Sequence, residues 1–107
     1  MAEGENNKAA GRSSHAEGRE TIAGGDYSHA EGYQTIAGYA AHAEGYYTEV
    51  NGEYGHAEGK MTIAGSSAHA EGYNTRARGI YSHAEGSSTK ATNSSAHSEG
   101  SATEANG

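Results

Sequence analysis

The tetrapeptide His-Ala-Glu-Gly recurs along almost the whole chain. Its copies begin at His15, His29, His42, His56, His69 and His83, with His-Ser-Glu-Gly at His97 and a degenerate Met1-Ala2-Glu3-Gly4 at the start. Successive copies lie thirteen or fourteen residues apart. Fold and function must therefore both be inferred from one short unit written eight times, which is the signature of a repeat structure.

The composition excludes an ordinary globular core. The 107 residues contain no Phe, Trp, Pro or Cys, and the aliphatic side chains larger than Ala are one Val, four Ile and two Met. Two alternatives remain: a disordered low-complexity chain, or a repeat structure that buries small residues. The strict period favours the second.

Each unit predicts two short strands separated by two turns. With the His of each copy counted as position zero, Gly follows at +3, and a second Gly or Asn, here called the closing Gly, ends the next segment. Both are residue types that tolerate positive φ. Because side chains alternate along a strand, the small residues at −1, +1, +3, +6 and +8 face the interior, while His, Glu and the variable residues face outward.

Stacked coils predict a rod. Each strand would pair with its own copy in the next coil about 4.8 Å away, so eight coils give a length of roughly 35 to 40 Å. The units at His29 and His56 are one residue shorter just before the closing Gly, which shortens a turn and keeps the strands in register. A coiled coil fails because the apolar seam is missing and two Gly per unit oppose a helix. Calcium-binding repeats fail because Asp26 is the only Asp.

Regular His and Glu at equivalent positions predict two parallel ladders on one face of the rod. A coil filled by Ala, Ser, Thr and Gly buries little apolar area, so a lone rod is marginal, and stacked Glu repel one another. Association through this face would answer both difficulties, since each imidazole can donate to a carboxylate of its own or a neighbouring chain. The predicted subunit interface comprises His15, Glu17, His29, Glu31, His42, Glu44, His56, Glu58, His69, Glu71, His83, Glu85, His97 and Glu99.

The tyrosines are the candidate ligand-binding groups. They lie either just after the +3 Gly or two residues before the next His, so we expect them at turns along the edges of the rod, where they either stack on one another or bind protein or sugar. These positions hold Tyr27, Tyr33, Tyr46, Tyr54, Tyr73 and Tyr81. The outward row of the second segment is mixed and predicts a solvated face with an apolar patch: Lys8, Ile22, Ile36, Glu49, Ile63, Arg76, Lys90 and Glu104.

Charge and motif content argue against several function classes. With 14 acidic residues against 7 Lys and Arg, neither nucleic acid nor a membrane is an expected partner. Ser-His pairs such as Ser14-His15 look like a nucleophile and base, but strand neighbours face opposite sides, so we expect no enzyme and no catalytic residue. Zn²⁺ or Ni²⁺ could bind His and carboxylates from several chains, but Glu already offers each His a partner, so we expect no metal and no cofactor.

The pattern Ser-x-Ala-x-Gly-x-x-Thr-x-Ala, here Ser28-His29-Ala30-Glu31-Gly32 continuing to Thr35-Ile36-Ala37-Gly38, resembles the YadA-like head repeats of trimeric autotransporter adhesins. The resemblance covers essentially the whole chain. It implies a left-handed parallel β-roll in which three chains pack about a threefold axis, at a bacterial surface, binding host matrix or cells. The family has Val and Ile where this chain has His and Glu, so a polar network would replace the apolar centre. Similar arrays also look like those in phage tail and fibre proteins.

Together these inferences predict an all-β, left-handed parallel β-roll of about eight coils of 13–14 residues, forming one domain over residues 1–107 and a homotrimer. Because the last copy ends in mid-unit, we expect a fragment of a longer surface or fibre protein. The predicted function is a non-enzymatic adhesin head or fibre segment at the cell surface that attaches to a host surface protein or glycan. The alternatives are a structural repeat of a phage tail fibre in the virion and a metal-binding β-roll scaffold.

Overall fold

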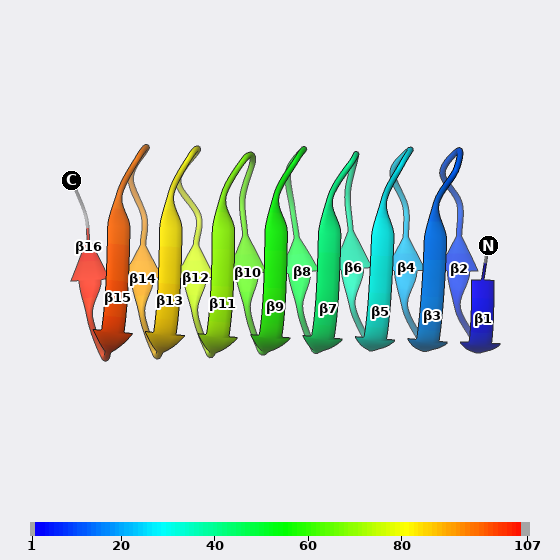
Figure 1. Ribbon diagram of the computed structural model, residues 1–107, viewed down its shortest axis with the longest axis horizontal. Helices are drawn as coiled ribbons and strands as arrows, with labels where there is room; N and C mark the ends of the chain where they lie inside the picture. Colours follow the sequence, from blue (N-terminus) through cyan, green and yellow to red (C-terminus); the bar gives the residue numbers. More distant parts are fainter. Residues whose placement is uncertain (1, 106–107) are drawn as a thin grey trace.

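The chain forms a parallel β-solenoid. The computed structural model describes residues 2–105, with side chains described from residue 4 onward. Each coil contains one long and one short strand, and the coils stack along the long axis of the molecule from β1 to β16 (Figure 1). The long strands are β1 (Ala2–Glu5), β3 (His15–Arg19), β5 (His29–Tyr33), β7 (His42–Tyr46), β9 (His56–Lys60), β11 (His69–Tyr73), β13 (His83–Ser87) and β15 (His97–Ser101). The short strands are β2 (Lys8–Ala9), β4 (Ile22–Ala23), β6 (Ile36–Ala37), β8 (Glu49–Val50), β10 (Ile63–Ala64), β12 (Arg76–Ala77), β14 (Lys90–Ala91) and β16 (Glu104–Ala105).

The strands make two eight-stranded sheets, one of long strands and one of short strands. Every pairing is parallel, and the His, Ala, Glu and Gly of one long strand pair with the same residue types of the next, as in β5 and β7. The exception among the described pairs is Ala84, which pairs with Ser98. The shorter unit at His29 leaves this register intact, because His29 still pairs with His42 and Ile36 with Glu49. The described chain measures 38 × 20 × 11 Å, which confirms the predicted rod.

Small side chains fill the interior, as the alternation predicts. Ala16 at +1, Thr21 at +6 and Ala23 at +8 are 0% exposed, and the same positions are buried in the coils from His29 to His83. In the last coil Thr103 and Ala105 are partly exposed. Val50 replaces Ala once and is the only described core aliphatic larger than Ala. The two sheets therefore approach closely, and little apolar area supports each coil.

The +3 Gly has the positive φ that the sequence predicts. These residues have φ between 116° and 123°, a region that L side chains rarely adopt. A Cβ at Gly45 would also collide with the carbonyl of Gly59 in the next coil. The +3 Gly is thus required by both backbone conformation and space.

The sequence analysis explains the closing Gly by positive φ, and this explanation is wrong. Gly25 and its equivalents do not have positive φ; the left-handed residue of this turn is a non-Gly residue two before the His, such as Tyr27 at φ 60°. The closing position is instead crowded, because a Cβ at Gly25 would collide with the backbone of Gly38 and Tyr39 in the next coil. A second left-handed residue lies at +5, for example Gln34 at φ 52°.

Candidate interaction surfaces

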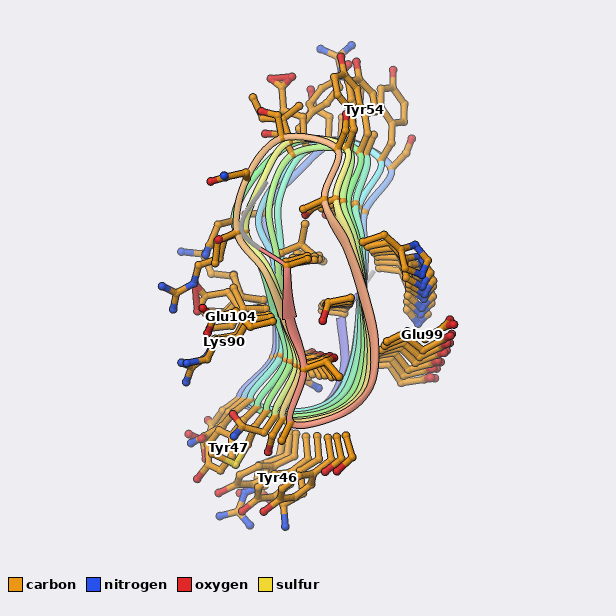
Figure 2. All side chains as sticks on the ribbon, turned by 90° about the vertical axis from the view of Figure 1, so that its left-hand side faces the viewer. Tyr46, Tyr47, Tyr54, Lys90, Glu99 and Glu104 are labelled. Atoms are coloured by element: carbon orange, nitrogen blue, oxygen red, sulfur yellow. The ribbon has the colours of Figure 1, made fainter. Side chains whose placement is uncertain are left out.

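The histidines form one continuous stack. Successive imidazoles from His15 to His97 lie 4.7–4.9 Å apart between ring centroids, with 2–9° between ring planes. In Figure 2 this row stands on one face of the coil, beside the row that ends at Glu99. The structure thus brings the predicted residues of the two ladders together on one surface, here called the His/Glu face.

Each His lies next to the Glu of its own coil. The distance from His Nε2 to the nearer carboxylate oxygen is 3.6–3.9 Å, which is longer than a hydrogen bond and suits an ion pair only when the imidazole is protonated. From coil His15 to coil His83 these side chains are 33–40% exposed. The two rows are therefore half-buried and remain accessible to a partner.

The environment of the central imidazoles favours their neutral form. Burial, followed by the charge of His29, lowers the pKa of His42 below its ordinary value, and burial followed by the charge of His42 does the same for His56. Neighbouring carboxylates act in the opposite direction but do not prevail. Burial and stacking therefore support neutral His42 and His56.

The carboxyl groups of the Glu row interact along the rod. Hydrogen bonds from the carboxyl groups of Glu71 and Glu44, when these carry a proton, lower the pKa of Glu58, and burial opposes this shift. The charges of His56 and His42 make a smaller contribution in the same direction once those imidazoles are protonated. Glu58 is accordingly ionised at neutral pH. The middle of the His/Glu face thus combines uncharged imidazoles with a charged carboxylate.

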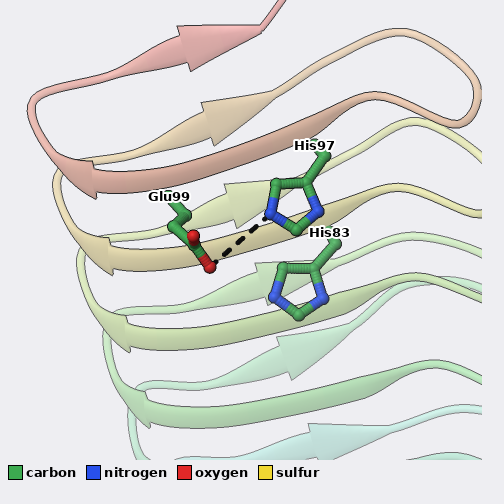
Figure 3. A group of neighbouring side chains, drawn as sticks. All are labelled: His83, His97 and Glu99. Carbon is green, nitrogen blue, oxygen red and sulfur yellow. Dashed lines mark ion pairs between the residues drawn. The ribbon is translucent and has the colours of Figure 1, made fainter.

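One group of side chains offers three metal-ligand atoms. The nearest donor atoms of His83, His97 and Glu99 all lie within 4.8 Å of one another (Figure 3). The two rings are nearly parallel, at 4° and 4.7 Å, so their nitrogens point the same way and do not converge on one point. A Zn²⁺ ion bound at about 2.0–2.1 Å from each nitrogen would require these rings to rotate.

The Ser residues before three of the histidines point away from them. Ser14, Ser28 and Ser82 donate their hydroxyls to the carbonyls of Gly11, Gly25 and Gly79 at 2.6–2.7 Å in the interior. The adjacent imidazoles lie outside the coil. The arrangement therefore does not place these hydroxyls beside the imidazoles that could activate them.

Tyr33, Tyr46 and Tyr73 lie along one edge of the rod and take part in a mixed aromatic and cationic row. Tyr33 and Tyr46 stack at 5.1 Å, and Lys60 Nζ lies 5.6 Å from the ring centroids of both Tyr46 and Tyr73. Arg19 caps Tyr33 at 5.6 Å. The sequence reasoning missed the two cations, although both share the +4 position with the tyrosines.

Tyr27, Tyr54 and Tyr81 lie along the opposite edge, where Figure 2 shows Tyr54 at the top and Tyr46 at the bottom. They are 54%, 61% and 69% exposed. Tyr39, which the sequence reasoning missed, contacts Tyr27 and Tyr54 edge-on at 6.2 and 5.7 Å. The six predicted tyrosines thus lie at two edges and do not form one site.

An open groove of about 700 Å³ lies between the +5 and +7 rows of the first four coils. Its polar wall comprises the +5 residues Asn6, Glu20, Gln34 and Tyr47. Its other wall comprises the +7 residues Ile22, Ile36 and Glu49. The sequence analysis identified only the +7 row and assigned no role to the residues at +5.

No family model matches the chain, and no curated protein matches it. Within residues 2–105, no helix has the length and apolar character that crossing a membrane would demand. The repeat geometry and its surfaces therefore carry the functional argument.

Proposed function

We propose that this chain is a non-enzymatic, rigid β-roll segment that assembles as a homotrimer through its His/Glu face. In this proposal it belongs to a bacterial surface adhesin and presents repeated contact surfaces to a host surface protein or glycan. Three copies of one weak contact surface would add through avidity. The same rod in a virion fibre would have a purely structural role.

The observation that carries the proposal is the unbroken match between coils on one face only. Seven imidazoles and their neighbouring carboxylates repeat at the coil spacing, whereas the opposite row changes from Lys8 to Ile22 to Glu49 and Arg76. A second copy of the chain presents the same spacing and meets this face coil for coil. Water alone would not require such regularity.

The energetics support association. Core positions hold Ala and Thr, so each coil buries little apolar surface, while the His and Glu side chains remain partly exposed. Covering the His/Glu face would add buried area and supply donors to the carboxylate row. The trimer number itself comes from the resemblance to YadA-like heads.

The solution mass tests the proposal, measured by sedimentation equilibrium with far-UV circular dichroism as the folding check. The variant H42A/H56A/H69A should shift the mass from trimer toward monomer. The matched control E49A/I63A/R76A changes the opposite face of the same three coils and should leave the mass unchanged. A folded His variant that keeps the trimer mass, or a monomeric unmodified chain, would contradict the assembly.

A further inference from the structure

The groove between the +5 and +7 rows has a polar wall and a largely apolar wall. The polar wall is formed by the +5 residues of four successive coils, each with a left-handed backbone and φ of 52–56°: Asn6, Glu20, Gln34 and Tyr47. Across from them, Ile22 and Ile36 are 38% and 39% exposed, which is unusual for large aliphatic side chains in a chain that contains so few. The groove can therefore contact polar and apolar parts of a ligand at the same time.

The polar wall is held in place by its own contacts. Gln34 Nε2 donates to Glu20 Oε1 at 3.2 Å, and Arg19 Nε lies 3.7 Å from Glu20 Oε2. The amide oxygen of Gln34 and the side chain of Asn6 lie on the same wall. Oriented amides and carboxylates of this kind form hydrogen bonds with hydroxyl groups through both donors and acceptors.

Tyr47 lines the groove in the last of its four coils and is held by contacts with two other tyrosines. It contacts Tyr46 edge-on at 4.3 Å and Tyr33 at 5.8 Å, and a hydrogen bond with Tyr46 raises its pKa. The ring is still 44% exposed. A fixed, exposed Tyr offers apolar contact area with little loss of side-chain entropy on binding.

The charge of the groove limits the ligand. Its described lining includes the carboxylates of Glu20 and Glu49 and no Lys, Arg or His. Arg19 offsets part of the charge of Glu20, so the repulsion of an anionic ligand such as a phosphate, a sulfate or a sialylated sugar comes mainly from Glu49. A neutral ligand with many hydroxyl groups avoids this repulsion and uses the carboxylates as acceptors.

The direction of the groove disfavours an extended peptide. The strands run across the groove, and their backbone amides are used between coils, as in the bonds from Ile22 N to Thr35 O and from Ile36 N to Thr48 O. An extended peptide along the rod would therefore find no strand edge with which to pair. A chain of pyranose rings needs no such edge, and one ring is about as long as one coil is thick.

We infer that this groove is a binding site for a neutral oligosaccharide lying along the rod axis. The C–H faces of its rings contact Ile22, Ile36 and Tyr47, and its hydroxyls bond to Glu20 and Gln34. This inference rests on the proposed function, because it names one of the contact surfaces that the rod would present and the class of ligand that this surface binds. The groove faces away from the His/Glu face, as the positions of Tyr47 and Glu99 in Figure 2 show, so assembly through that face leaves it open.

The test uses the folded chain of residues 1–107, applied to a printed array of neutral, sialylated and sulfated oligosaccharides together with Lys-rich peptides. Neutral oligosaccharides should be retained and the acidic ones should not. For a retained sugar, Q34A and Y47A should each raise the Kd by roughly tenfold or more in calorimetry. The control M61A removes the +5 side chain of the next coil, and Y54A removes an exposed Tyr of the opposite edge; both should leave the Kd unchanged.

Three results would overturn the inference: no neutral sugar retained, retention of only acidic sugars or peptides, or a Kd that the groove variants do not change. The sedimentation mass of the same samples separates this inference from the assembly. A monomer that binds the sugar leaves the groove site intact and contradicts the trimer. A trimer that binds no neutral sugar supports the assembly and contradicts the groove site.

Discussion

The imidazoles of His42 and His56 lie parallel, 4.8 Å apart and 5° between planes, at equivalent positions of successive coils. Two protonated rings at this separation would repel each other, and both are partly shielded from water. The stacked geometry and burial therefore favour the neutral form of His42 and His56. The stability of the stack should depend on pH in a direction that these two residues set.

We predict that the melting temperature falls as the pH is lowered through about 6.5, the unperturbed pKa of His. The folded-state pKa of His42 and His56 is lowered, so protonation favours the unfolded chain, and their stabilisation is lost as pH falls toward the folded pKa. The lowered pKa of Glu58 adds a further loss at more acidic pH. Thermal unfolding by circular dichroism from pH 8 to pH 4 measures this, and a melting temperature that rises between pH 7 and pH 5 would contradict it.

The variant H42Q/H56Q provides the control for this slope. Gln keeps a polar side chain of similar length and does not titrate. Between pH 7 and pH 5 its melting temperature should change less than that of the unmodified chain, whatever its absolute stability. An equal slope would assign the pH dependence to other groups.

Gly45→Ala should abolish folding or lower the free energy of unfolding by several kcal/mol, since it combines a disfavoured φ with a backbone collision. Gly45 has φ 123°, and an added Cβ meets the backbone of Gly59. Gly24→Ala is the matched control, because Gly24 has no positive φ and its nearest neighbours would lie 3.8 and 3.9 Å from the new Cβ. Urea unfolding should show a stable Gly24→Ala protein; comparable losses in both variants would contradict this account.

The strands and the inward faces could be predicted because the Gly at +3 repeats in every coil and the +1 residue is Ala in every coil but the last, where it is Ser98. The role of Gly25 could not, because its crowding arises from the approach of Tyr39 and Gly38 in the next coil, which the one-coil pattern does not contain. The groove was missed for a similar reason. Its walls depend on the left-handed backbone at +5, where Asn6 is the only wall residue of a type that favours this conformation, and Glu20, Gln34 and Tyr47 give no such signal.

Thr62→Val should raise the stability by about 1 kcal/mol, because it removes a buried hydroxyl that lacks a hydrogen-bond partner and keeps the side-chain shape. Thr62 is 0% exposed, and no hydrogen-bond partner of its Oγ1 is described. Thr21→Val is the control: the Thr21 hydroxyl lies 3.0 Å from Asn7 Oδ1 and donates to it, so this variant should lose stability. Melting temperatures that shift in the same direction in both variants would contradict the argument.

Lys60→Ala should lower the stability by about 0.5–1 kcal/mol, the range for an exposed cation–π contact. Lys60 Nζ lies 5.6 Å from both Tyr46 and Tyr73, so the variant interrupts the row between them. Lys90→Ala removes an exposed Lys on the opposite sheet, for which no described aromatic contact exists, and should change the melting temperature less. If the two substitutions lower the melting temperature equally, the loss of stability comes from removing a positive charge and not from the cation–π contacts of Lys60.

Removal of metal ions should leave the melting curve unchanged. The donor atoms of His83, His97 and Glu99 lie within 4.8 Å of one another, but the rings are parallel at 4.7 Å, so binding Zn²⁺ would break the stacking that runs along the row. Thermal unfolding with and without EDTA, on protein purified without an affinity metal, measures this. The contrary result would be a melting temperature that falls with EDTA and returns with Zn²⁺ in the unmodified chain but not in His97→Ala. It would show that this end of the His/Glu face holds a metal ion and that ring stacking is secondary there.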